Sequence, residues 1–297
     1  MKLKDKIAII TGGAAGFGKE VAKKVASKGW RIIIGNRNIE KMEAARQEII
    51  EKTGNEDIIT LPLDLSSMRS TREFADAVKA LGYPIDSLLC NAGISSTPGR
   101  TEDNLDKVFE TNYLGHFLLT WMLLPDLAED GKILLISSDM HEGLFAPLQY
   151  KPAEEVAFPD EAYAEHPDRY NFSKLYVLYF VYELAERLNA AGSKKVVNAF
   201  NPGLMHTTGL IPDKRMFTDE FLARMKATGH MGNLEENADT VTALMTEDGV
   251  GRDNGAYYDR ATVPGKSSAL SYEEAPRREV WELSLRLTGL KDEDLVL

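Results

Sequence analysis

The stretch Thr11-Gly12-Gly13-Ala14-Ala15-Gly16-Phe17-Gly18 lies between an apolar run at 6–10 and apolar residues at helical spacing over 16–28. The run is typical of a buried strand, and the spacing after it is typical of a helix. Glycine permits a sharp turn between the two and leaves room for a ligand. The helix points its positive end at the loop, where it favours phosphate. The stretch therefore predicts a strand, turn and helix that bind the pyrophosphate of a dinucleotide; a plain glycine-rich turn is the alternative.

Beyond this unit, apolar runs and amphipathic stretches alternate along the chain. Further strands are expected at 31–34, 58–63, 87–90, 132–136 and 195–200, and further helices at 39–50, 67–81, 104–127 and 170–189. Apolar strands that alternate with helices imply a parallel sheet covered on both faces. We therefore predict an α/β fold, a doubly wound parallel sheet of the Rossmann type, with its ligand at the carboxyl ends of the strands.

Two segments interrupt this alternation. Residues 139–168 contain four prolines and several acids, and we expect this insertion to cover the active site at the sheet edge. Residues 204–237 are rich in methionine and phenylalanine, and we expect a substrate-binding region with two short helices. Because no linker composition separates a second domain, residues 1–297 are predicted to form one domain.

Composition bounds the partners and the environment. The 35 basic and 46 acidic side chains give a net charge of −11, which disfavours nucleic acid as a partner. Cys90 is the only cysteine, so no internal disulfide forms, in keeping with a reducing compartment. No stretch approaches the roughly 20 apolar residues of a membrane span, and the N-terminus lacks the apolar core of a signal peptide. We expect a cytoplasmic protein.

The spacing Gly12-x-x-x-Gly16-x-Gly18 resembles that of the short-chain dehydrogenase/reductase family. Other motifs of that family follow in the same order: Asn91-Ala92-Gly93 after the fourth strand, Asn112 in the next helix, Ser138 after the fifth strand, Tyr170-x-x-x-Lys174, and Pro202-Gly203 with Thr207 after the sixth. The resemblance implies an enzyme that passes hydride between a nicotinamide cofactor and an alcohol or carbonyl group.

The resemblance further implies a catalytic set of Asn112, Ser138, Tyr170 and Lys174. Tyr170 and Lys174 are four residues apart and share one helix face, and a neighbouring ammonium group lowers the pKa of a phenol. Tyr170 would exchange a proton with the substrate oxygen, which Ser138 would orient. Lys174 would also hold the nicotinamide ribose, and Asn112 would link Lys174 to solvent through water. For the tyrosine and lysine alone, a surface helix pair is the alternative.

Cofactor choice depends on the end of the second strand, Gly35-Asn36-Arg37-Asn38. NAD-selective enzymes usually place an acid there to bind the ribose hydroxyls. This stretch has no acid, and Arg37 can pair with a 2′-phosphate, so we predict NADP(H), with NAD(H) and a solvated Arg37 as the alternative. Asp64 and Leu65, after the third strand, resemble the pair that contacts the adenine in this family. For Asp64, a role as the N-cap of the next helix is the alternative. The predicted cofactor contacts are Gly12, Gly16, Phe17, Gly18, Arg37, Asp64, Leu65, Asn91, Ala92, Gly93, Tyr170, Lys174, Pro202, Gly203 and Thr207.

Ser138 and Tyr170 are 32 residues apart, which is farther than in many family members. The long insertion, the stretch 114–120 and the tail motifs at 255–258 and 281–284 resemble the branch of retinol dehydrogenases and protochlorophyllide reductases. Eight apolar residues flank the site and predict a roomy cleft for a steroid, a retinoid-like chain or an aromatic carbonyl. For each of these residues, a position in the protein core is the alternative. The eight residues are Met140, Leu144, Phe145, Leu204, Met205, Leu210, Met216 and Phe217.

Three other functions stay open: a non-catalytic redox sensor that binds the dinucleotide, an NAD(H)-dependent hydroxysteroid dehydrogenase, and a light-driven chlorophyll-type reductase. No metal site is expected, because His116, His141 and His166 lie on different elements without ligand spacing. The expected helices at 104–127 and 170–189 pair subunits in many family members. The second carries aromatic residues around much of its circumference, which is typical of a deeply buried or interfacial helix, so we expect a homodimer or homotetramer.

Overall fold

An eight-stranded sheet in the order β3-β2-β1-β4-β5-β6-β7-β8 forms the centre of the computed structural model, which describes residues 6–95, 97–144, 146–160, 166, 168–211 and 213–297. Neighbouring strands from β3 to β7 are parallel, and β8 is antiparallel to β7. The strands are β1 (Ile7–Thr11), β2 (Arg31–Asn36), β3 (Ile58–Pro62), β4 (Ile85–Cys90), β5 (Leu127–Ile136), β6 (Val196–Asn201), β7 (Tyr257–Asp259) and β8 (Pro264–Gly265).

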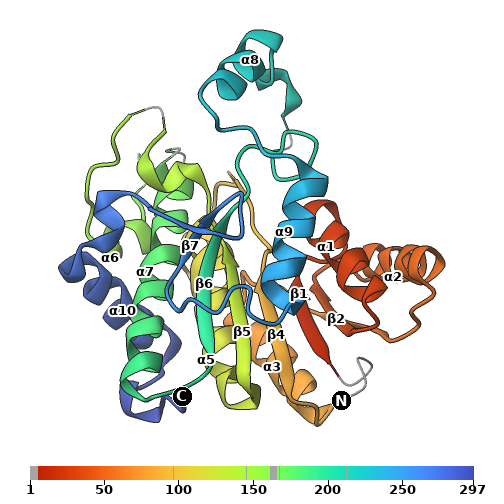
Figure 1. Cartoon of the computed structure of the whole chain (residues 1–297). Helices are drawn as coiled ribbons and strands as arrows, with labels where there is room; N and C mark the ends of the chain where they lie inside the picture. Colours follow the sequence, from red (N-terminus) through yellow and green to blue (C-terminus); the bar gives the residue numbers. More distant parts are fainter. Residues whose placement is uncertain (1–5, 96, 145, 161–165, 167, 212) are drawn as a thin grey trace.

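Helices cover both faces of the sheet (Figure 1). On one face lie α1 (Gly16–Ser27), α2 (Ile39–Thr53) and α9 (Leu234–Thr246). On the other lie α3 (Met68–Ala80), α5 (Gly115–Leu123) and α7 (Asp168–Ala190), with α6 (Ala153–Ala157) and α10 (Glu274–Thr288) outside α7. The predicted α/β fold with a doubly wound sheet is therefore confirmed.

The apolar runs of the sequence are continuous because each central strand contributes to two cores. In β1, Ile7 and Ile9 pack with α3, α5 and α7, whereas Ala8 and Ile10 pack with α1, α2 and α9. A strand covered on both faces needs apolar side chains at odd and even positions alike. The strand order reverses between β1 and β4, and in open sheets ligands bind at such a switch point.

The expected single helix at 104–127 is wrong. A short helix α4 (Lys107–Phe109) begins where Asp106 accepts hydrogen bonds from the backbone N–H groups of Val108 and Phe109. A wider π-helical turn follows over Glu110–Leu114, and α5 then runs only to Leu123. A tight turn at Leu124–Asp126, with proline in its first positions, ends the helix, and β5 starts at Leu127. Hydrophobic spacing alone does not distinguish these turns from one continuous helix.

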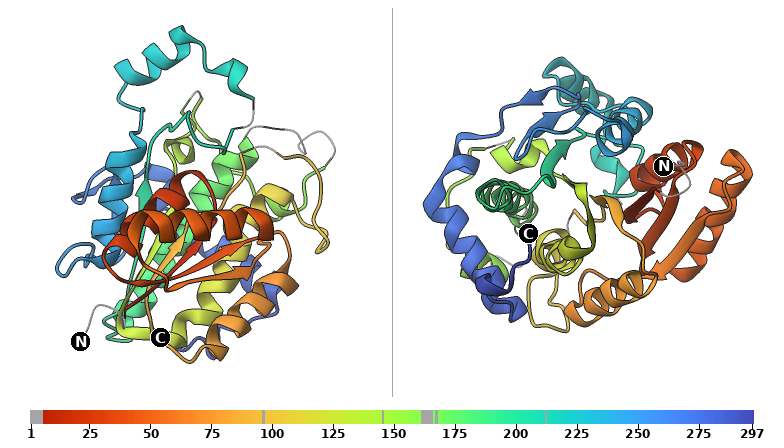
Figure 2. Two further views of the ribbon diagram at one scale, coloured as in Figure 1. Left: turned by 90° about the vertical axis from the view of Figure 1, so that its right-hand side faces the viewer. Right: turned by 60° about the horizontal axis from the view of Figure 1, so that its bottom comes forward.

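The two additions to the alternating pattern contain little regular structure. The insertion at 139–168 has a short turn at Asp139–Glu142 and the helix α6. The region 204–237 has a turn at Lys214–Met216, the helix α8 (Asp219–Ala227) and the first residues of α9. The helix α8 stands beyond the sheet, at the end opposite both chain termini (Figure 2). Phe145 lies outside the described residues.

The aromatic residues of α7 are covered within the chain itself, because Tyr176, Tyr179, Phe180 and Tyr182 are all buried in the single chain. The ring of Trp281 on α10 lies 5.3 Å from Phe117, 5.9 Å from Trp121 and 6.1 Å from Phe180 between ring centroids. The hydroxyl groups of Tyr113 and Ser284 are 2.7 Å apart. Deep burial therefore explains why α7 is apolar on several sides, and the oligomeric state stays a prediction. In the described part of the chain, no helix is long and apolar enough to cross a membrane.

Candidate active site

A cleft of about 700 Å³ opens where the parallel strands end. The segments after β1 to β6 contribute to its wall, and so does the start of α7. The cleft is lined by every predicted catalytic and cofactor residue except Asn112 and Thr207. The sequence motifs therefore converge on one site, as the topology requires for residues that follow parallel strands.

The glycine loop is shaped for close approach of a ligand. Gly12 and Gly16 have φ angles of 70° and 51°, in the left-handed region that favours glycine. A side chain at Gly18 would place its Cβ 2.8 Å from the carbonyl oxygen of Gly12, so only glycine fits there. The helix α1 begins at Gly16 and directs its free N–H groups at the loop. These residues fit the pyrophosphate of a dinucleotide.

A buried set of hydrogen bonds fixes the loop against the end of β4. The Thr11 hydroxyl oxygen accepts hydrogen bonds from the backbone N–H groups of Asn91 and Ala92, at 2.9 and 3.0 Å. Its own hydrogen points to Nε2 of His116 at 2.9 Å, and Nδ1–H of His116 donates to the Asn112 carbonyl at 3.1 Å. Burial lowers the pKa of His116 to about 4, so the ring is neutral. His116 thus links the hydroxyl of Thr11 to the backbone of Asn112.

Tyr170 and Lys174 project from the first turns of α7, as their spacing predicts. The Lys174 ammonium is buried, donates to the carbonyl oxygen of Ile136 at 2.8 Å, and lies 5.6 Å from the centre of the Tyr170 ring. Burial lowers the pKa of Lys174 to about 8. Burial also raises the pKa of Tyr170 to about 12, against the opposing hydrogen bond with Ser138. The expected lowering of the tyrosine pKa is therefore wrong, because desolvation outweighs the opposing hydrogen bond with Ser138.

Asn112 lies behind the cleft, within the π-helical turn. Its Oδ1 accepts a hydrogen bond from the N–H of Ile94 at 2.8 Å, and its Nδ2 donates to the Ile94 carbonyl at 2.9 Å. Nδ2 also donates to Oγ of Ser173 at 3.0 Å, and that hydroxyl donates to the Tyr170 carbonyl at 2.7 Å. Asn112 therefore joins the segment after β4 to the turn of α7 that carries Tyr170.

The end of β2 presents two cations to the cleft. Arg37 lines it as expected, and so does Lys41, which the sequence analysis missed. Asn38 caps α2 by accepting a hydrogen bond from the N–H of Lys41 at 2.7 Å, so the lysine lies in the first turn of the helix. The only signal for Lys41 in the sequence was its place in the first turn of the expected helix after the second strand.

Asp64 lines the cleft after β3, and it is not the N-cap of α3. Its carboxylate accepts hydrogen bonds from the N–H and the hydroxyl of Ser66, at 3.0 and 2.7 Å. Ser67 is the N-cap, and its Oγ accepts from the N–H of Ser70 at 3.1 Å. The capping alternative for Asp64 is therefore wrong, and its carboxylate stays beside the cleft.

Apolar side chains from the two additions form the other half of the cleft. Seven of the eight predicted ones line it, and the eighth is Phe145. The neighbour Thr208, not Thr207, lines the wall opposite Gly16. Three further apolar side chains that the sequence motifs did not single out also line the cleft: Ile211, Phe221 and Met225. Among the described residues, no group of three or more His, Cys, Asp or Glu side chains is placed to hold a metal ion.

The chain has many known relatives. The family model described as short chain dehydrogenase matches residues 6–147. Human polyprenol dehydrogenase is 32% identical, over 97% of this chain and 86% of its own length. Human retinol dehydrogenase 13 is 32% identical, over 96% of this chain and 85% of its own length.

Solved structures share the fold. An uncharacterised protein from Mycobacterium paratuberculosis superposes with a TM-score of 0.76 at 26% identity, covering 99% of this chain and 96% of that one. The NADP complex of RhlG from Pseudomonas aeruginosa superposes with a TM-score of 0.67 at 23% identity, covering 88% of this chain and 96% of that one.

Proposed function

The chain belongs to the short-chain dehydrogenase/reductase family, enzymes of alcohol and carbonyl groups, and from this premise we propose that it interconverts a bulky apolar alcohol and its carbonyl compound with NADP(H). The observation that carries the proposal is the composition of one cleft. Tyr170, Ser138 and Lys174 line the same cleft as the glycine loop and a set of apolar side chains. This arrangement suits hydride transfer to a carbon that bears an apolar substituent.

The catalytic chemistry follows from the groups at the start of α7. The bound cofactor supplies or accepts the hydride. Tyr170 is protonated at neutral pH because burial raises its pKa to about 12, so it suits donation of a proton to a carbonyl oxygen. Ser138, hydrogen-bonded to Tyr170, orients that oxygen. Lys174 contributes positive charge near the phenol and, with one backbone acceptor, has donors left for the ribose hydroxyls.

The preference for NADP(H) is supported by charge. Arg37 and Lys41 line the cleft where the ribose of a dinucleotide would lie after β2, and the β2 end, Gly35–Asn38, brings no carboxylate there. Two cations favour a 2′-phosphate, whereas NAD-selective sites have an acid at this place.

The proposed substrate is a long, apolar alcohol or aldehyde of the isoprenoid type. Two relatives are named for polyprenol and retinol, which both carry a hydroxyl on an extended apolar chain. Nine methionine, leucine and phenylalanine side chains of the insertion and of residues 204–237 line the cleft and suit such a chain. We propose these two segments as the parts of a single domain that determine the substrate. The steroid expected from the sequence alone is a second candidate of the same chemical character.

A substrate panel tests the proposal. Oxidation of NADPH would be followed with retinal, a polyprenal, a ketosteroid and a short polar ketone. We expect the highest kcat/KM with the two extended aldehydes and the lowest with the polar ketone. Turnover of the polar ketone alone would contradict the apolar cleft. Binding of NADPH without turnover of any carbonyl would favour the redox sensor.

A further inference from the structure

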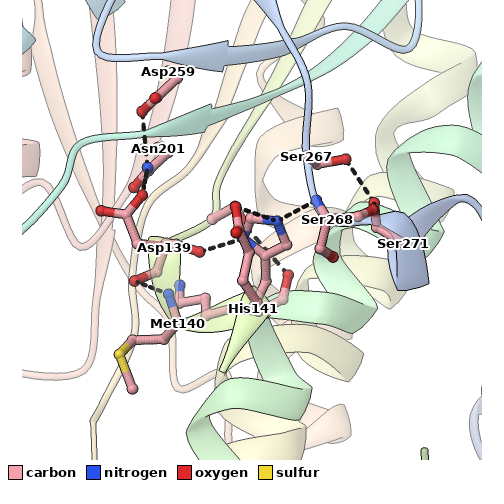
Figure 3. Close-up of polar contacts among 12 residues, drawn as sticks. Asp139, Met140, His141, Asn201, Asp259, Ser267, Ser268 and Ser271 are labelled. Carbon is pink, nitrogen blue, oxygen red and sulfur yellow. Dashed lines mark hydrogen bonds and ion pairs between the residues drawn. The ribbon is translucent and has the colours of Figure 1, made fainter. Parts of the chain in front are cut away.

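His141 lies three residues after Ser138 and is completely buried. Its ring forms a hydrogen bond at each nitrogen (Figure 3). Nδ1 lies 2.6 Å from the carbonyl oxygen of Ser138, and Nε2 lies 3.0 Å from the backbone nitrogen of Ser268. A carbonyl oxygen only accepts and a backbone N–H only donates, so the hydrogen must be on Nδ1. Burial lowers the pKa of His141, which favours this neutral form.

The segment that holds Nε2 is itself firmly attached to α7. The hydroxyl groups of Ser267 and Ser271 are 2.6 Å apart, and the Ser271 hydroxyl donates to the Ser268 carbonyl at 2.6 Å. Tyr182 on α7 bonds the Ser267 hydroxyl at 2.6 Å, and Tyr179 on α7 donates to the carbonyl of Leu270 at 3.2 Å. The segment 267–272 therefore gives His141 a rigid support.

Asp139, which directly follows Ser138, is fixed from the opposite side. The Asp139 carboxylate accepts a hydrogen bond from the side-chain amide of Asn201. It also forms an ion pair with Arg260, with 2.8 Å between Oδ2 and Nη1. The amide of Asn201 also donates to Asp259 at 2.9 Å. Figure 3 shows Asn201 between Asp139 and Asp259 on one side of the turn, and the contacts of Ser267, Ser268 and Ser271 on the other. The backbone that carries the Ser138 hydroxyl is thus held between β6, β7 and the segment 267–272.

We propose that His141 is a positioning residue for the reaction. It fixes the Ser138 carbonyl against the segment 267–272, and this directs the Ser138 hydroxyl toward Tyr170. The inference rests on the proposed function, because it assumes that Ser138 orients the substrate oxygen. His141 itself does not line the cleft.

Two variants separate the two hydrogen bonds of the ring. The amide of asparagine reaches the place of Nδ1, so His141→Asn keeps a donor for the Ser138 carbonyl and loses the contact with Ser268. The amide of glutamine reaches the place of Nε2, so His141→Gln keeps an acceptor for Ser268 and loses the donor for Ser138. His141→Phe loses both. The backbone N–H of His141, 3.1 Å from the same carbonyl, remains in all three.

We expect kcat to fall about 10- to 100-fold in His141→Gln and His141→Phe, and clearly less in His141→Asn, because a small misplacement of a catalytic group has effects of this size. The KM for NADPH should stay within about twofold, since the dinucleotide loop is on other elements. Ser268→Pro is a second variant that removes the N–H while keeping the φ of −61° that proline adopts. It should lower kcat less than His141→Gln does.

Thermal denaturation and fluorescence titration with NADPH would verify that each variant is folded. Equal losses of activity in the asparagine and glutamine variants, in step with lower Tm, would indicate a structural role and overturn the inference. Unchanged kcat in both His141→Gln and Ser268→Pro would overturn it as well. Tyr170→Phe distinguishes the two proposals. If it retains activity, the proposed function fails, and if it is inactive while the His141 variants are normal, only the positioning role fails.

Discussion

Lys174 donates a hydrogen bond of 2.8 Å to the carbonyl oxygen of Ile136, and this is the one such bond of its buried ammonium among the described residues. Lys132 on β5 is buried as well, but it donates to three carbonyl groups, those of Leu244, Glu247 and Val250, at 3.0, 2.7 and 2.7 Å. Burial lowers the pKa of both to about 8. The fold therefore uses all three N–H donors of Lys132, whereas Lys174 keeps donors for a ligand.

The two lysines form a matched pair for mutation. Lys174→Met should abolish turnover and leave Tm at or above that of the unaltered protein, because the variant no longer buries a weakly compensated charge. Lys132→Met should lower the free energy of unfolding by about 2 kcal/mol, because carbonyls at the end of α9 lose their donor. Urea denaturation and NADPH oxidation measure both effects. A large loss of stability in Lys174→Met would contradict the assignment of that lysine to catalysis.

The pH dependence of the reaction should differ between its two directions. A raised folded-state pKa keeps the Tyr170 phenol protonated as the pH rises, so carbonyl reduction should change little from about pH 6 to about pH 7, below the pKa of about 8 of Lys174. Alcohol oxidation needs the deprotonated phenol, so its kcat should increase with pH over the same range and beyond. Initial rates in both directions measure this. An oxidation rate that declines steadily with pH would argue against Tyr170 as the base.

Cofactor preference should depend on the two cations after β2. We expect Arg37→Ala and Lys41→Ala each to raise the KM for NADPH about tenfold, which corresponds to roughly 1.4 kcal/mol, and to leave the KM for NADH nearly unchanged. Lys52→Ala, in the last turn of α2, is a control that removes an exposed lysine away from the cleft. An unchanged KM for NADPH in the double variant Arg37→Ala/Lys41→Ala would disprove the preference.

The sequence predicted what is local to each strand end. Gly12, Gly16 and Gly18 follow β1 directly, and Tyr170 and Lys174 are one helical turn apart, so spacing alone placed them on one site. The length of α1 and the start of α2 were also predictable, because amphipathic spacing and turn residues mark them clearly.

Features that depend on distant contacts were not predictable. The side chain of Asn112 bonds Ile94 and Ser173, which only the folded arrangement of α7 and β4 brings together. The raised pKa of Tyr170 likewise depends on how deeply the folded chain buries the phenol, whereas the sequence indicated only a neighbouring positive charge. For α7, spacing did not distinguish a subunit interface from intramolecular burial, because Trp281 lies far along the chain.

The cover of α5 and α7 by α10 has a consequence for synthesis of the chain. About 150 residues must be added between the end of α5 and the start of α10, which takes roughly 8 to 30 s at about 5–20 residues per second. During that interval, in which β5 to β8 and α7 are also added, Phe117 and Trp121, and Phe180 once it has been made, have no partner from α10. A nascent chain with such an uncovered aromatic surface is a natural client for chaperones. Truncation before α10 should therefore give an insoluble product even though the cleft residues are all present.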